Sequence, residues 1–138
     1  LVDDAVKKGA RVVCGGTSRG VLVAPTVVDR VTSDMKLFRD ESFGPVVGVM
    51  RVSGVEAAVA AANDTEYGLT AAVYTQDERR AKKVLAQVNA GSVYWNCCDR
   101  VSPRLPWSGV KHSGIGLTLS TYGIQAFTRP KAWHLRGA

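Results

Sequence analysis

Apolar residues along this chain alternate between extended runs and helical spacing. Residues 46–52 are almost continuously apolar, which is typical of a strand buried on both faces. Ser53 and Glu56 have the spacing of a capping box, which marks the start of a helix. Apolar residues follow at helical spacing; they are Val55, Ala58, Val59 and Ala62. The pattern therefore predicts a strand followed directly by an amphipathic helix.

The same order repeats further along the chain. Residues 69–74 predict a strand, and Thr75 with Glu78 predicts a second capping box. The helix after it has two faces. The apolar face consists of Ala81, Val84, Leu85 and Val88, and the basic face consists of Arg79, Arg80, Lys82 and Lys83. Gly91 suits the position just after a helix end, and residues 93–96 predict the next strand. This alternation predicts an α/β fold with a largely parallel sheet and flanking helices.

The two ends of the chain extend this pattern less regularly. Residues 2–8 predict a helix, and residues 11–14 and 21–28 predict extended segments. Residues 97–116 contain prolines and glycines without a clear period, and such a long irregular stretch is more often a functional loop than a spacer. A short helix over 117–122 and an extended segment over 127–135 complete the prediction.

Composition excludes several classes of protein. The chain has 138 residues, 46% of them hydrophobic and 22% charged, as in an ordinary globular domain. No apolar run is long enough to cross a bilayer, so we expect no membrane partner. The three cysteines are an odd number, with Cys14 far from the adjacent pair Cys97 and Cys98, which argues against a disulfide framework and favours a cytoplasmic location. His112 and His134 lie far apart in sequence, with no Cys or carboxylate at the spacing of metal ligands, so we expect no metal site.

The net charge of +6 is concentrated near the C-terminal end. Residues 100–138 hold six Lys and Arg residues and no Asp or Glu, whereas charges balance in the rest of the chain. A basic segment can meet a phosphate-bearing cofactor, an acidic partner or nucleic acid. These six charges are spread out and do not alternate with aromatic residues, so we expect no nucleic-acid partner.

One short run places chemistry directly before the apolar strand. In E-S-F-G-P-V, residues 41–46, a carboxylate able to accept hydrogen bonds and a phenyl ring able to pack on a flat heterocycle stand on a backbone that Pro45 stiffens. The run resembles the E-x-F-G-P-V signature of the NAD(P)-dependent aldehyde dehydrogenase superfamily. The resemblance continues in family order through N-D-T-E-Y-G-L at 63–69, G-S-V-Y-W-N at 91–96 and P-W-S-G-V-K-H-S-G at 106–114.

This resemblance implies a C-terminal fragment of the catalytic domain. The family's nucleophilic cysteine stands in a G-Q-x-C context and its general-base glutamate in an E-L-G-G context, and neither motif occurs in these 138 residues. Residues 1–126 would be part of the catalytic domain, and residues 127–138 an oligomerisation strand and tail. The parent protein would oxidise an aldehyde to a carboxylic acid with NAD or NADP, as a homo-oligomer. The fragment alone would be inactive and bind no cofactor.

The resemblance also implies roles for four residues. Glu41 would accept hydrogen bonds from the nicotinamide ribose hydroxyls, and Phe43 would pack near the nicotinamide ring. Val101 and Trp107 would wall the aldehyde tunnel. Each has a structural alternative: a solvated loop carboxylate for Glu41, core packing for Phe43, and cover of the loop's own core for Trp107.

Two other interpretations come from the residues themselves. The chain could be a non-catalytic interaction module that pairs through its terminal strand, and this is the alternative function. Cys97 and Cys98 could be nucleophiles, but we predict that they, like Cys14, are small buried hydrophobic residues. Asn96 ends a predicted strand, and we expect it to hydrogen-bond the backbone of the loop that follows, as a structural residue.

Overall fold

The computed structural model describes residues 1–98 and 100–137 of the chain. Contacts divide it into two compact units, Leu1–Thr65 and Glu66–Ala138, and each has its own strands and helices. The predicted division of residues 1–126 from residues 127–138 stays a prediction. No described helix is long and apolar enough to cross a membrane.

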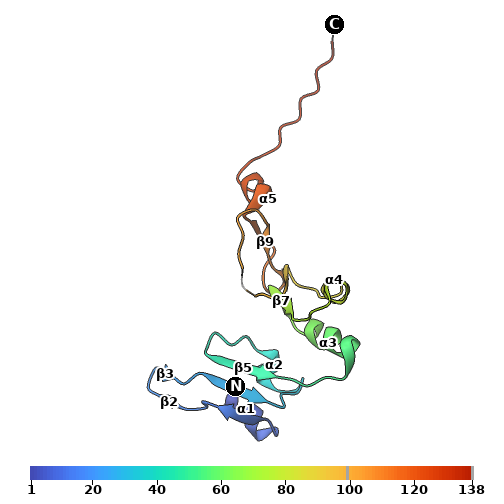
Figure 1. Ribbon diagram of the computed structural model, residues 1–138. Coiled ribbons are helices and arrows are strands. Elements are labelled where there is room, and N and C mark those ends of the chain that lie inside the picture. The colour runs from blue at the N-terminus through green and yellow to red at the C-terminus, as the bar shows by residue number, and fades with distance from the viewer. Residues whose placement is uncertain (99, 138) are drawn as a thin grey trace. The chain divides into compact units, whose positions relative to one another are not determined.

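The first unit is built on a three-stranded sheet (Figure 1). Its strands β1 (Arg11–Cys14), β4 (Thr26–Asp29) and β5 (Val46–Val49) lie in that order; β1 runs antiparallel to β4, and β5 runs parallel to β4. A short hairpin of β2 (Ser18–Arg19) and β3 (Leu22–Val23) stands between β1 and β4 in sequence. The helices are α1 (Val2–Lys7), α2 (Lys36–Arg39) and α3 (Gly54–Asn63).

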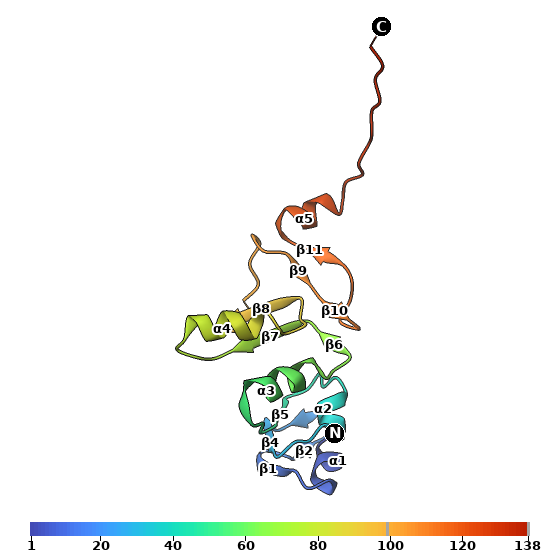
Figure 2. The same cartoon turned by 90° about the vertical axis from the view of Figure 1, so that its right-hand side faces the viewer.

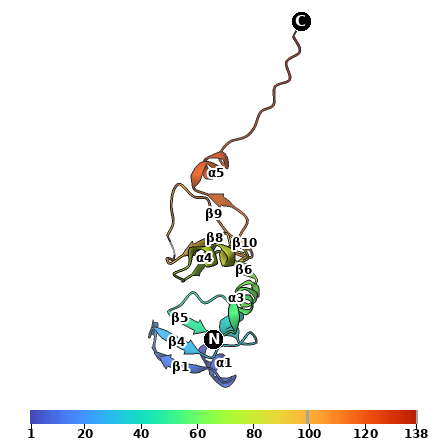
Figure 3. The same ribbon diagram turned by 45° about the vertical axis from the view of Figure 1, so that its right-hand side comes forward.

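A small apolar core holds this unit together. Its buried members are Ala5, Ala10, Val28, Val31 and Met35. They come from α1, from β4 and from the segments around them, so the core ties the first helix to the middle strand (Figure 3). The prediction that residues 46–52 are buried on both faces is wrong: Val47 and Val49 are exposed. The reason is that β5 is an edge strand of the described sheet, with β4 as its one partner.

The second unit pairs its strands in twos. Strands β7 (Thr70–Val73) and β8 (Ser92–Trp95) are parallel, and α4 (Glu78–Leu85) connects them and contacts both (Figure 2). Two antiparallel pairs follow: β6 (Tyr67–Gly68) with β10 (Val110–Lys111), and β9 (Trp107–Ser108) with β11 (Leu117–Thr118). Helix α5 (Ser120–Gln125) comes next, and residues 128–137 form neither helix nor strand.

The observed fold is mixed α/β, as predicted, but its sheets are smaller. Among the described residues, parallel pairing is limited to β4 with β5 and β7 with β8, in separate sheets. A single largely parallel sheet is therefore not confirmed, and neither is an oligomerisation strand at residues 127–138. Residue 138 lies outside the described residues.

Both predicted capping boxes require correction. Ser53 is the N-cap of α3, but its side chain accepts no capping hydrogen bond. At α4 the N-cap is Asp77, whose Oδ1 accepts from the Arg80 amide at 3.1 Å, and Thr75 is not the cap. Thr75 is held at the end of β7, because its backbone is hydrogen-bonded to the end of β8. The helix therefore begins two residues later than the spacing of Thr75 and Glu78 predicts.

The amphipathic pattern of α4 is confirmed. Ala81 is buried, and Val84, Leu85 and Val88 are half-buried, whereas the four basic residues on the opposite face are exposed. Gly91 does not end this helix, which stops at Leu85. Gly91 stands just before β8, where a Cβ atom would overlap the backbone carbonyl of Ser108. It therefore lets the segment at Ser108 approach β8 closely, and Gly91 and the neighbouring Trp107 both line the pocket described below.

Candidate functional site

The turn that carries Glu41 and Phe43 lies in the first unit, just before β5. Two hydrogen bonds hold its backbone on the C-terminal side: the Thr26 amide donates to the Pro45 carbonyl at 2.8 Å, and the Val46 amide donates to the Gly44 carbonyl at 2.8 Å. Glu41 is exposed, and the Phe43 side chain is 97% exposed. Phe43 is thus not a core residue of the described chain. The turn presents a carboxylate and a bare aromatic ring from a rigid backbone.

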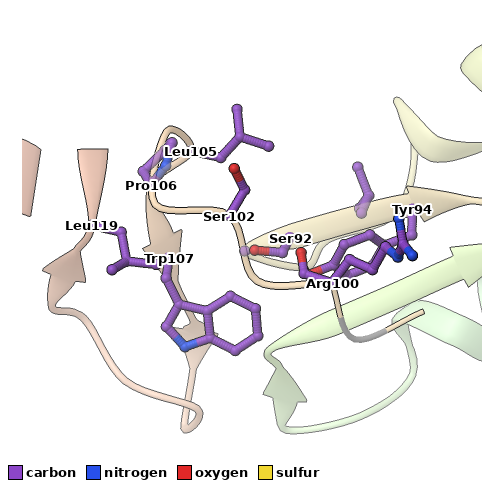
Figure 4. Close-up of a pocket in the computed structure, with 10 residues that line it drawn as sticks. Ser92, Tyr94, Arg100, Ser102, Leu105, Pro106, Trp107 and Leu119 are labelled. Carbon is purple, nitrogen blue, oxygen red and sulfur yellow. The ribbon is translucent and has the colours of Figure 1, made fainter. Parts of the chain in front are cut away.

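A pocket of about 210 Å³ lies in the second unit (Figure 4). It is lined from β8, from the loop after it, and from β9 and the residue after β11. The lining residues are Gly91, Ser92, Val93, Tyr94, Arg100, Ser102, Leu105, Pro106, Trp107 and Leu119. Its size is below the usual range of about 300–1,000 Å³ for drug-sized ligands, so it suits a small molecule.

The structure separates the two residues that were expected to wall the aldehyde tunnel. Trp107 lines the pocket and is half-buried, while Val101 is 58% exposed and does not line it. Glu41 and Phe43 belong to the other unit. Of the four predicted site residues, the pocket therefore contains Trp107 alone.

Several pocket residues were not identified from the sequence. Tyr94, Arg100, Leu105 and Leu119 are separated by up to 25 positions, and the chain returns through β9 and β11 to bring them together. A weak signal was present, because alternation along 92–95 places Ser92 and Tyr94 on one face of the strand.

Backbone hydrogen bonds hold the pocket loop in place. Tyr94 Oη donates to the Arg100 carbonyl at 3.3 Å, and the Leu105 amide donates to the Ser102 carbonyl at 3.1 Å. The Ser120 amide donates to the Pro103 carbonyl at 3.0 Å, which joins the loop to the start of α5. These bonds join the described part of the loop, residues 100–106, to β8 on one side and to the start of α5 on the other.

Asn96 fixes the point where β8 passes into this loop. Its Oδ1 accepts from the Thr75 amide and its Nδ2 donates to the Thr75 carbonyl, both at 2.9 Å. The indole Nε1 of Trp95 donates to the same carbonyl at 2.8 Å. Asn96 has a φ of 53°, a left-handed conformation that Asn adopts more readily than most residues. Asn96 thus hydrogen-bonds backbone in a structural role, but these two bonds go to Thr75, beyond the end of β7, and not to the loop after Asn96 as predicted.

We predict that Asn96→Ala destabilises the second unit by about 1–3 kcal/mol, because it removes two hydrogen bonds and puts alanine at a positive φ. Asn96→Gly loses the same bonds but keeps the backbone conformation accessible. Denaturant unfolding should therefore give the highest free energy of unfolding for wild type, a lower one for Asn96→Gly and the lowest for Asn96→Ala. Equal stability of all three proteins would contradict this role.

The three cysteines differ from the sequence prediction. All are free; Cys14 and Cys98 are exposed, and Cys97 is half-buried, so the prediction of small buried hydrophobic residues is wrong for two of them. The hydrogen bond with Cys98 raises the pKa of the Tyr74 phenol, with burial as a further cause. Cys14 is the last residue of β1, whereas Cys97 and Cys98 follow β8.

His112 has a partner that sequence spacing did not reveal. Its Nδ1 lies 3.5 Å from Oε2 of Glu66, and its ring meets Tyr67 edge-on. The antiparallel pairing of β6 with β10 brings these distant positions together. Within residues 1–98 and 100–137, no group of three or more His, Cys, Asp or Glu residues could hold a metal ion.

Comparison with known proteins places the chain in a family. The family model described as "Aldehyde dehydrogenase family" matches residues 1–133. The chain belongs to the aldehyde dehydrogenase family. It is 41% identical over 134 residues to an aldehyde dehydrogenase of Paenarthrobacter nicotinovorans, and that match covers 95% of this chain and 29% of the relative.

Solved structures agree with this assignment. A salicylaldehyde dehydrogenase from Pseudomonas putida G7, complexed with salicylaldehyde, matches with a TM-score of 0.89 and 33% identity over 99% of this chain and 29% of its own. A betaine aldehyde dehydrogenase from Staphylococcus aureus, in complex with NAD+, matches with a TM-score of 0.86 and 32% identity over 91% of this chain and 26% of its own. The chain thus spans less than a third of the length of these relatives.

Proposed function

We propose that this chain is part of an NAD(P)-dependent aldehyde dehydrogenase, to which it contributes cofactor and substrate contacts. The observation that carries the proposal is the family match over residues 1–133. The staphylococcal relative with NAD+ bound supports use of a nicotinamide cofactor, and the salicylaldehyde complex supports an aldehyde as substrate. The parent protein would convert the aldehyde to a carboxylic acid through a cysteine outside these residues.

Glu41 and Phe43 are the proposed cofactor contacts. A carboxylate accepts hydrogen bonds from paired hydroxyls, so Glu41 is suited to a ribose. A flat ring packs well on another flat ring, and Phe43 is bare in the described chain, which leaves its face free for nicotinamide. When bound, the nicotinamide would accept a hydride from the substrate. The residues of this chain would position that ring and its ribose.

Trp107 is the proposed substrate contact. Its indole forms an apolar wall of the pocket, and such walls discriminate substrates by shape and buried area. Val101 stays a candidate only for a tunnel completed by other parts of the protein, because it lies outside this pocket.

We predict that Trp107→Ala in the active protein changes the relative kcat/KM among aldehydes by about tenfold, since a changed apolar pocket shifts discrimination by that order. The KM for NAD(P)+ should stay the same. A panel of aliphatic and aromatic aldehydes measures the effect. Tyr122→Ala is the matched control, because Tyr122 is an exposed aromatic residue that lies outside the pocket. A panel with unchanged ranking would argue against Trp107 as a substrate contact.

A homo-oligomer formed through residues 127–138 is the second candidate role. Residues 128–137 form neither helix nor strand. The exposed apolar residues of the segment are Phe127, Trp133 and Leu135. Exposed apolar residues on an extended segment can pair with a strand of another subunit. Deletion of residues 127–138 is expected to lower the oligomeric state in sedimentation velocity, and an unchanged state would contradict this role.

A further inference from the structure

The pocket of the second unit has an uneven distribution of charge. Among the described residues, Arg100 is the one charged side chain that lines it. No carboxylate in the described ranges lies within ion-pair distance of Arg100, whereas the structure does pair Arg51, Arg39 and two lysines. Residues 100–138 also contain no Asp or Glu. Asp99, directly before Arg100, lies outside the described residues; among those that the structure describes, Arg100 gives the pocket a positive charge that no carboxylate offsets.

The pocket wall holds the backbone at Arg100. Tyr94 Oη donates to the Arg100 carbonyl at 3.3 Å, which holds the backbone of Arg100 beside β8. Figure 4 shows Arg100 and Tyr94 on one side of the pocket, with Trp107 and Leu119 on the other. A bound molecule would thus meet apolar surface at one end and a guanidinium at the other.

Size and shape narrow the kind of molecule that fits. The volume of about 210 Å³ suits one ring or a short chain. The indole of Trp107 and the side chains of Leu105 and Leu119 offer apolar area to such a body. The planar guanidinium of arginine matches a carboxylate with two parallel hydrogen bonds.

We propose that this pocket selects small aldehydes that carry a carboxylate, with Arg100 binding the carboxylate and Trp107 packing on the body of the molecule. This rests on the proposed function, since it names the substrate class of that enzyme. Arg100 is a specificity-determining residue in this scheme and takes no part in the bond-making steps. Because Arg100 is exposed, solvent weakens the pairing, and we expect a preference of about tenfold.

The test uses 4-formylbenzoate and its neutral methyl ester as paired substrates of the active protein that contains this chain. Wild type should have the higher kcat/KM for the carboxylate. Arg100→Met should lower kcat/KM for 4-formylbenzoate about tenfold and leave the ester unchanged, while Arg100→Lys should keep part of the preference. Raising the ionic strength should reduce the wild-type preference, since salt screens an exposed pair.

Arg104→Met is the matched control. Arg104 is an exposed arginine of the same loop that does not line the pocket, so its loss changes net charge equally and should leave the preference intact. Equal effects of Arg100→Met and Arg104→Met, or equal loss for acid and ester, would overturn the proposal.

A binding measurement separates this proposal from the proposed function. Titration of 4-(hydroxymethyl)benzoate and its methyl ester onto the protein needs no turnover. Binding of the acid that weakens about tenfold in Arg100→Met supports the anion site even in a protein that oxidises no aldehyde. A protein that oxidises aldehydes but binds acid and ester alike would keep the proposed function and overturn the carboxylate preference.

Discussion

Glu41→Gln is expected to raise the KM for NAD(P)+ and lower kcat, with kcat/KM for the cofactor falling about ten- to a hundredfold. The reason is that the amide keeps the size of the side chain but loses the negative charge that accepts hydrogen bonds from ribose hydroxyls. A hydrogen bond to a charged group contributes about 1.5–3 kcal/mol, and each 1.4 kcal/mol is a factor of ten. Steady-state kinetics with the cofactor as varied substrate measures the change.

The neighbouring carboxylate provides the control for this prediction. Asp40 is also exposed, and it lies directly before Glu41 at the end of α2. Asp40→Asn removes the same charge from the same turn and should leave cofactor kinetics unchanged. Thermal unfolding of both variants should match wild type, because Glu41 is outside the core. Wild-type cofactor kinetics in Glu41→Gln would remove Glu41 from the proposed site.

The second large effect concerns the 138 residues alone, which should oxidise no aldehyde. Covalent catalysis requires an activated nucleophile, and the family's cysteine and glutamate motifs do not occur in this sequence. Incubation with NAD+ or NADP+ and a simple aldehyde should give no increase in absorbance from reduced cofactor. Activity abolished by Cys97→Ser or Cys98→Ser would show that the nucleophile lies within this chain after all.

The same isolated chain should self-associate. Phe43 and Phe127 are each at least 95% exposed, and Trp133 is 70% exposed. Apolar patches beyond a few hundred Å² are rarely left uncovered on a monomer. Light scattering at micromolar concentration is expected to show a dimer or larger species. A monodisperse monomer at that concentration would be incompatible with this expectation.

Local patterns determined the elements that depend on neighbouring residues. The apolar face of α4 and the turn after it repeats within eight positions, Ala81 to Val88, and burial follows it. The strands at β7 and β8 were located to within one or two residues, because short β-branched and apolar runs between turn residues specify them. The family motifs, which are also short, led to the family that the later comparison shows.

Tertiary structure decided every feature that joins distant positions. Thr75, two residues beyond β7, is not a helix cap, and Asn96, 21 residues away, binds its backbone. Trp107 and Arg100 share a pocket, and Val101 does not, because β9 pairs with β11 and Tyr94 holds the loop. Burial of β5 also depends on partners beyond its own run of residues. Periodicity is set within a few residues, whereas such contacts depend on where the chain returns in space.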